Sequence, residues 1–150
     1  MKKQCVIGIG NILLRDDGIG VHLISELLKE KFKCDVDLID GGTSTFDLLG
    51  YFIDNEKVIV VDSLKGGHEP GTIYRITPEE LGTYIKANSS LHDVQVFDIL
   101  KQAKLMGHNP EVIIIGVEPY EIFYDMELSP TLKNEIPNII RIVKEEIESE

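Results

Sequence analysis

The sequence predicts a three-layer α/β sandwich, in which helices cover both faces of a mostly parallel, twisted five-stranded sheet. Short apolar runs alternate along the chain with stretches of helical spacing, an order typical of a covered parallel sheet. The run VIVV at 58–61 is apolar at every position, as expected of a strand buried on both faces. With 150 residues, 43% of them hydrophobic and 27% charged, the chain has the composition of one globular domain, which we expect to span 1–150.

Five apolar runs are expected to form the strands of this sheet. The run that begins at 71 follows Pro70, which has no amide hydrogen to donate to a neighbouring strand. Pro70 therefore favours an edge position, or the first residue of a strand, for that run. The predicted strands cover 5–9, 36–39, 57–61, 71–76 and 112–117.

Helical patterns fill the segments between the strands. Thr77, Pro78 and Glu80 form a helix start, because Thr can cap the helix, Pro fits its first position and Glu can close a capping box. Pro137 is expected to interrupt or kink the last helical region, since proline lacks the amide donor that a helix interior needs. The predicted helical regions cover 18–31, a short segment around 46–49, a start at 77, a helix from 90 to 106 and the C-terminal region from 129.

The charge balance argues against two classes of partner. The chain has 26 acidic and 15 basic residues and a formal net charge of −11, which repels nucleic-acid phosphates and anionic membrane surfaces. No apolar stretch approaches the roughly 18 residues of a membrane span. Cys5 and Cys34 are too few for a disulfide scaffold, so we expect a reducing, cytoplasmic environment. The acidic surface also leads us to expect a monomer.

The candidate chemistry lies where ligands bind in such folds, beyond the carboxyl ends of the strands. Asp17 lies in the loop after the first strand, Asp62 follows the third strand, and His92 stands near the start of a later helix. Two carboxylates and one imidazole suit a borderline divalent ion such as nickel or zinc and leave positions open for water or substrate. Taken alone, each residue is also compatible with a helix cap, a loop acid or a structural histidine.

Other chemistries fit the first loop, GIGNILLRDDGIG at 8–20, less well. A dinucleotide-binding fingerprint would need a third glycine at position 13, which is Leu13, and Asp16 and Asp17 would repel a pyrophosphate. No Gly-Lys-Ser/Thr follows, which excludes a phosphate-binding P-loop. Ser63 comes directly after Asp62, but no base in these motifs would activate it as a covalent nucleophile.

The loop GIGNILLRDDGIG closely resembles the N-terminal motif of the hydrogenase maturation endopeptidases, the proteases that trim the large subunit of nickel–iron hydrogenases. The resemblance continues in order through the rest of the chain, with the segment around His92 and with LIDGGT at 38–43, LLG at 48–50, VVDS at 60–63, IGVEP at 115–119 and LSPTL at 128–132.

This resemblance implies a three-layer α/β fold and a metal-contacting set formed by Asp17, Asp62 and His92, which would also be the catalytic residues. It favours Asp17 over Asp16 as the ligand and makes Asp16 a loop-shaping acid that caps the helix. The family motif at 40–42 implies that Asp40, Gly41 and Gly42 contact the substrate, although Asp40 would equally hold its own turn.

The implied substrate is a large-subunit precursor already loaded with nickel, from which a C-terminal peptide is released. The nickel would then be supplied by the substrate. Two mechanisms stay open: the metal polarises the scissile carbonyl or activates a water, or Asp17 or Asp62 acts as general base while nickel only docks the substrate. A non-catalytic binding module that gates assembly of the nickel-loaded subunit is the alternative function. A nucleotide-binding α/β protein is a third hypothesis.

Overall fold

The computed structural model describes residues 3–81 and 91–149, and of residues 45–46 and 91–94 it describes the backbone only. The strands are β1 (Gln4–Ile9), β2 (Asp37–Gly42), β3 (Lys57–Ser63), β4 (Ile73–Ile76) and β5 (Glu111–Val117). The helices are η1 (Arg15–Gly18), α1 (Ile19–Leu27), η2 (Thr45–Leu48), α2 (Leu49–Asp54), α4 (Leu91–Leu105) and α5 (Pro130–Glu148).

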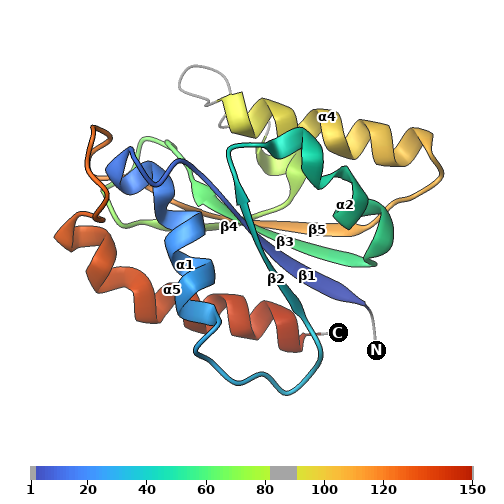
Figure 1. Cartoon of the computed structure of the whole chain (residues 1–150), viewed down its shortest axis with the longest axis horizontal. Helices are drawn as coiled ribbons and strands as arrows, with labels where there is room; N and C mark the ends of the chain where they lie inside the picture. Colours follow the sequence, from blue (N-terminus) through green and yellow to red (C-terminus); the bar gives the residue numbers. More distant parts are fainter. Residues whose placement is uncertain (1–2, 82–90, 150) are drawn as a thin grey trace.

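The strands form one sheet in the order β2-β1-β3-β5-β4. All neighbours pair in parallel except β4, which runs antiparallel to β5 at the edge. Helices α2 and α4 lie over one face of the sheet, and α1 and α5 lie over the other (Figure 1). The predicted three-layer fold with a mostly parallel five-stranded sheet is confirmed. No helix in the two described ranges is both long and apolar enough to cross a membrane.

Strand β3 separates the two hydrophobic cores. Val58 and Val60 belong to the core under α2 and α4, whereas Ile59 and Val61 belong to the core under α1 and α5. Because side chains alternate along a strand, the last two residues of β3, at 62–63, project to opposite faces of the sheet. The strand therefore delivers one polar side chain toward each helical layer.

Two glycines allow α1 to lie directly on the sheet. A Cβ added to Gly20 would come within 2.2 Å of the Val61 carbonyl oxygen, and one added to Gly8 within 2.1 Å of the Gly20 carbonyl oxygen. Both distances are far below van der Waals contact, so a side chain at either position would force α1 away from β1 and β3. This close approach fixes the loop that precedes α1 over the carboxyl edge of the sheet.

Two strands extend further than the sequence predicts. Pairing continues from β1 to β2 through Gly8–Asp40 and Ile9–Gly42, and from β3 to β5 through Ser63–Val117. The polar motifs at 40–42 and 62–63 are therefore the last residues of their strands. Apolar patterning misses this, because main-chain hydrogen bonds continue after the hydrophobic run has ended.

The helix signals at the two prolines have different outcomes. The Glu80 carboxylate accepts from the Thr77 amide at 3.1 Å, and the Glu80 amide donates to Thr77 Oγ1 at 3.3 Å, as the capping box predicts. Of the predicted interruption or kink at Pro137, the interruption is wrong, since α5 continues from Pro130 to Glu148. Buried side chains on both sides of Pro137, such as Leu132 and Ile139, anchor the helix in the core and outweigh the lost hydrogen bond.

A buried ion cluster ties the end of α5 to the beginning of β3 and to β4. Lys57, 2% exposed, donates through Nζ to the Glu146 carbonyl at 2.6 Å and lies 3.1 Å from Glu146 Oε1. Arg75 Nε donates to Glu146 Oε2 at 2.8 Å. Burial by itself raises the pKa of Glu146, but hydrogen bonds from Arg75 and Lys57 outweigh it and lower this pKa below its ordinary value of 4.5.

We expect Glu146→Gln to remove part of the acid dependence of folding stability. A carboxyl whose pKa is lowered by folding stabilises the native state above its ordinary pKa, and this stabilisation disappears as the pH falls below about 4.5. The difference in free energy of unfolding between wild type and E146Q should therefore be largest near neutral pH and shrink in acid. Urea unfolding across this pH range measures it, and a difference that is constant with pH would contradict the assignment.

Candidate active site

Asp17 and Asp62 are both hydrogen-bonded to Ser63, at the carboxyl edge of the sheet. Ser63 Oγ donates to Asp17 Oδ1 at 3.2 Å, and the Ser63 amide donates to Asp62 Oδ1 at 2.7 Å. A second donor, the Asn11 amide, lies 3.0 Å from Asp17 Oδ2. Asp17 is 8% exposed and Asp62 4% exposed. The two carboxylates thus occupy a nearly closed environment in which hydrogen bonds fix their orientation.

The hydrogen bonding of Ser63 to both acids is the feature that the sequence does not reveal. Sequence reasoning considers this residue only as a nucleophile. Its hydroxyl points toward the α1 layer, where Asp17 precedes the helix, while its amide bonds the neighbouring carboxylate. Strand alternation predicts the face on which Ser63 lies, but the partner becomes visible only once the place of the first loop is known.

His92 is the second residue of α4, and its side chain lies outside the described residues. Helix α4 packs on the same face of the sheet as Val58 and Val60, and alternation places Asp62 on that face as well. Among the side chains that the structure does describe, no three of His, Cys, Asp or Glu lie close enough together to hold a metal ion. The set of Asp17, Asp62 and His92 therefore stays a prediction.

The motif at 40–42 lies beside the first loop. Asp40 Oδ1 accepts from the Gly42 amide at 3.0 Å, so its carboxylate holds its own turn. The Gly42 carbonyl accepts from the Gly10 amide at 2.9 Å, with Gly42 at a φ of +52° that favours glycine. Gly41 is buried against Ile7 and the Gly8 carbonyl. Contact of these three residues with substrate stays a prediction.

Asp16 is fully buried and binds the segment that leads into α5. Its Oδ1 accepts from the Ser129 amide at 2.8 Å. Its Oδ2 accepts from Ser129 Oγ at 2.8 Å, the Tyr120 amide at 2.9 Å and the Glu121 amide at 3.0 Å. The expectation that Asp16 caps the helix that follows it is wrong, because no side chain caps η1 or α1. Asp16 instead shapes two loops at once, and its oxygens are occupied by protein donors.

The first loop and the segment at 119–128 lie side by side (Figure 1, dark blue and orange). The Arg15 amide donates to the Asp125 carbonyl at 2.8 Å, and Arg15 Nη1 donates to Asp125 Oδ2 at 2.8 Å. Arg15 adopts a φ of +47°, which is unusual for a side-chain-bearing residue. This conformation is maintained by the contacts on both sides of the residue, and it lets Arg15 and Asp16 bind the same neighbouring segment.

Glu118, the acid that follows β5, organises another loop at this edge. Its Oε1 accepts from the Gly66 amide at 2.9 Å, the His68 amide at 3.2 Å and the Tyr74 hydroxyl at 2.5 Å. Glu118 is 7% exposed. We therefore assign it the structural role of holding the loop between β3 and β4.

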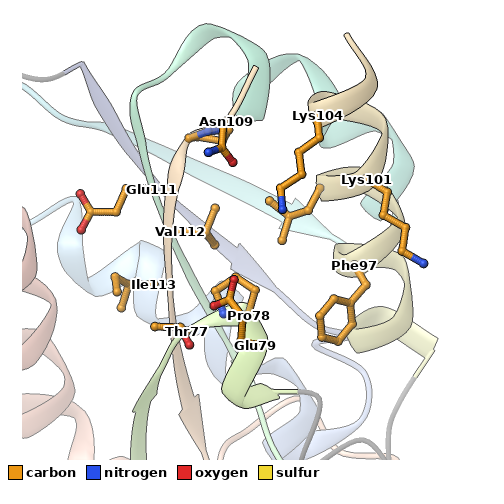
Figure 2. A pocket seen from close by; sticks show the side chains of 12 residues that line it. Thr77, Pro78, Glu79, Phe97, Lys101, Lys104, Asn109, Glu111, Val112 and Ile113 are labelled. Carbon is orange, nitrogen blue, oxygen red and sulfur yellow. The ribbon is translucent and has the colours of Figure 1, made fainter. Parts of the chain in front are cut away.

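A cavity of about 480 Å³ lies away from these acids, between α4 and the first residues of β5 (Figure 2). Phe97, Lys101 and Lys104 border it from α4, while Glu111 and Val112 border it from β5. The candidate acids Asp17 and Asp62 do not line this cavity, because they lie at the opposite end of the parallel strands.

We expect Asp16→Asn to destabilise the protein much more than Asp17→Asn. In D16N an amide NH₂ would face an N–H or O–H donor in either orientation, which costs roughly 2–4 kcal/mol. In D17N the oxygen can face the Asn11 amide, and the Ser63 hydroxyl can turn to accept, so the loss should stay within about 1 kcal/mol. Chemical denaturation of both variants tests this. Equal losses would show that Asp16 does not have the stabilising role described here.

Comparison with known proteins places these features in a family. A family model described as hydrogenase maturation protease matches residues 21–146. A putative hydrogenase maturation protease of Methanocaldococcus jannaschii is 34% identical over 144 residues, which cover 93% of this chain and 92% of the relative. The hydrogenase expression/formation protein HupD of Rhodobacter capsulatus is 32% identical over 139 residues. The match covers 90% of this chain but only 66% of that longer relative.

Solved structures agree with this assignment. The hydrogenase maturating endopeptidase HybD of Escherichia coli superposes with a TM-score of 0.86 at 29% identity, over 94% of this chain and 89% of its own. The [NiFe] hydrogenase maturation protease HybD of Thermococcus kodakarensis gives a TM-score of 0.80 at 25% identity, over 98% and 99% of the two chains. The resemblance of the first loop, the similar folds and the family match agree, and the chain belongs to the hydrogenase maturation protease family.

Proposed function

We propose that this protein is an endopeptidase that removes the C-terminal extension of a nickel-loaded [NiFe] hydrogenase large-subunit precursor. The observation that carries the proposal is that Asp17 and Asp62 each accept a hydrogen bond from Ser63, on the loop-bearing edge of the sheet. Membership of a family of maturation proteases supports the activity, and the similar protein of Thermococcus kodakarensis is a [NiFe] hydrogenase maturation protease. The same family names favour an enzyme over a non-catalytic binding module.

In this proposal the two carboxylates act on the peptide bond to be cleaved. One of them accepts a proton from the attacking water, whose oxygen forms the new bond to the scissile carbonyl carbon. The carbon–nitrogen bond breaks, and the proton passes to the departing amine. Orientation of Asp17 by two hydrogen bonds, and of Asp62 by the Ser63 amide, supports this role, because a general base must be held within reach of its proton.

The nickel belongs to the substrate in this proposal, and Asp17, Asp62 and His92 would contact it. Carboxylate oxygen and imidazole nitrogen are suitable ligands for a borderline divalent ion. Two such carboxylates lie at the edge, and α4 carries His92 on the face that Asp62 occupies. A nickel contact supplies either recognition of a loaded precursor or polarisation of the scissile carbonyl.

The remaining assignments concern the surroundings of the site. We propose that Asp40, Gly41 and Gly42, which adjoin the first loop through Gly10, contact the substrate chain. The free cysteines Cys5 and Cys34 support a cytoplasmic location, since reducing conditions keep thiols unpaired. We also propose that the protein acts as a monomer, because its net charge of −11 disfavours association between copies.

Intact mass spectrometry tests the activity directly. A candidate precursor, loaded with nickel or free of metal, is incubated with a substoichiometric amount of the protein. Loss of a C-terminal peptide from the loaded form alone, with many turnovers per protein molecule, is the expected result. A stable complex without cleavage of the cognate precursor would favour the binding module instead.

We expect Asp17→Asn and Asp62→Asn each to reduce precursor cleavage by about 10³-fold or more, because a general base or metal contact is lost. Thermal unfolding should show that both variants remain folded. His92→Ala should also abolish processing if His92 completes the set. A variant with all three changes that cleaves at the wild-type rate would eliminate these residues from the mechanism.

Ser63 is proposed as a positioning residue. Ser63→Ala removes the hydroxyl that orients Asp17 but keeps the amide that orients Asp62, so we expect kcat to fall about tenfold with little change in KM. Ser63→Thr keeps the hydroxyl and suits a strand, and it should restore most of the rate. If S63T is as slow as S63A, the effect comes from packing and not from the hydrogen bond.

A further inference from the structure

Large apolar side chains gather on the two loops beside Asp17. We call this set the rim patch. Leu13 is 50% exposed on the first loop, and Tyr124 is 86% exposed on the segment after β5. Such side chains are normally exposed singly, whereas a contiguous group marks an interaction surface. The rim patch consists of Ile12, Leu13, Tyr120, Ile122, Phe123, Tyr124 and Met126.

The two loops that carry the patch are held in a fixed arrangement. The Asp125 amide donates to the Leu13 carbonyl at 3.1 Å, and the Arg15 guanidinium lies 5.2 Å from the centre of the Phe123 ring. The Asp16 carboxylate accepts hydrogen bonds from the amides of Tyr120 and Glu121. The exposed side chains are therefore presented by a pre-organised backbone, which lowers the entropic cost of binding.

The composition of the patch is that of a protein interface. Tyr, Phe and Met are enriched at interfaces, and aromatic side chains supply most of the binding hot spots. The chain has 5 Tyr and 5 Phe, and three of these aromatic residues fall within the segment 120–126. Elsewhere in the described part of the chain, Leu105 and Met106 are comparably exposed, at 88% and 58%, at the far end of α4. Leu105 and Met106 therefore serve as a control for exposed apolar side chains outside the rim patch.

Charge and position select the partner. The acids Glu121, Asp125 and Glu127 lie between or beside the patch residues in sequence. Arg15 pairs with Glu121 and Asp125 and Lys133 pairs with Glu127, but the chain as a whole carries −11. Two copies that each carry −11 would repel each other, whereas an apolar area bordered by Lys and Arg would be attracted. The patch also shares its first loop with Asp17, so a protein bound there lies beside the candidate active site.

We infer that the rim patch docks the folded body of the precursor, through an apolar area on that subunit bordered by basic residues. This inference rests on the proposed function and deepens it, because it separates substrate capture from peptide cleavage. The residues that bind the precursor are then different from the residues that cleave its peptide bond. Docking at this surface would bring the C-terminal extension within reach of Asp17 and Asp62.

The test compares two variants of the full chain. Tyr124→Ser with Met126→Ser removes the two most exposed side chains of the patch. Leu105→Ser with Met106→Ser is the control for exposed apolar area. The binding of purified nickel-loaded precursor is measured by calorimetry, cleavage by intact mass and self-association by sedimentation velocity. We expect the patch variant to raise Kd and KM by about tenfold or more, with kcat unchanged, and the control to match wild type.

Each alternative result has a distinct meaning. A patch variant that binds and cleaves like wild type would overturn the docking surface and leave the protease assignment intact. A wild-type dimer that the patch variant dissociates would assign the patch to self-association and overturn the inference. If wild type binds the cognate precursor through the patch but does not cleave it, the docking surface stands and the proposed protease activity fails. If wild type neither binds nor cleaves it, both proposals fail.

Discussion

The buried carboxylate of Asp16 is the interaction on which the arrangement of the site depends. It accepts hydrogen bonds from the amides of Tyr120, Glu121 and Ser129 and from the Ser129 hydroxyl. Without it, the amide and hydroxyl of Ser129 would be buried without this partner, which is costly in a protein interior. One side chain thus joins the loop that carries Asp17 to the segment that carries the exposed aromatic residues and leads into α5.

The fold could be predicted from sequence because it depends on patterns that act locally. A run such as VIVV at 58–61 favours a strand buried on both faces, and five short strand-like runs separated by helical patterns define the layers. The positions of Asp17 and Asp62 follow from the same reasoning, since the carboxyl ends of parallel strands share one edge. The structure places both at that edge and confirms the predicted sheet.

What could not be predicted depends on contacts between residues far apart in the chain. Asp16 and Ser129 are separated by 113 residues, so spacing alone suggests a local helix cap. Pro137 resembles a helix breaker because the core packing that maintains α5 around it is invisible in the local sequence. In the sequence Ser63 resembles an unactivated nucleophile. Its hydrogen bond to Asp17 depends on the packing of α1 against the sheet, which the local sequence does not show.

The dependence of both ends of the sheet on α5 has a consequence for biosynthesis. Asp16 requires Ser129 at the carboxyl edge, and Lys57 requires Glu146 at the opposite edge, 89 residues later in the chain. Domains fold during translation only as their segments leave the ribosome. A nascent chain can therefore form the β1 and β3 pairing early, yet it lacks the Tyr120, Glu121 and Ser129 donors that order the loop of Asp17 until residues 120–129 have emerged. The loop that carries Asp17 would therefore be ordered later than the strand pairing beside it.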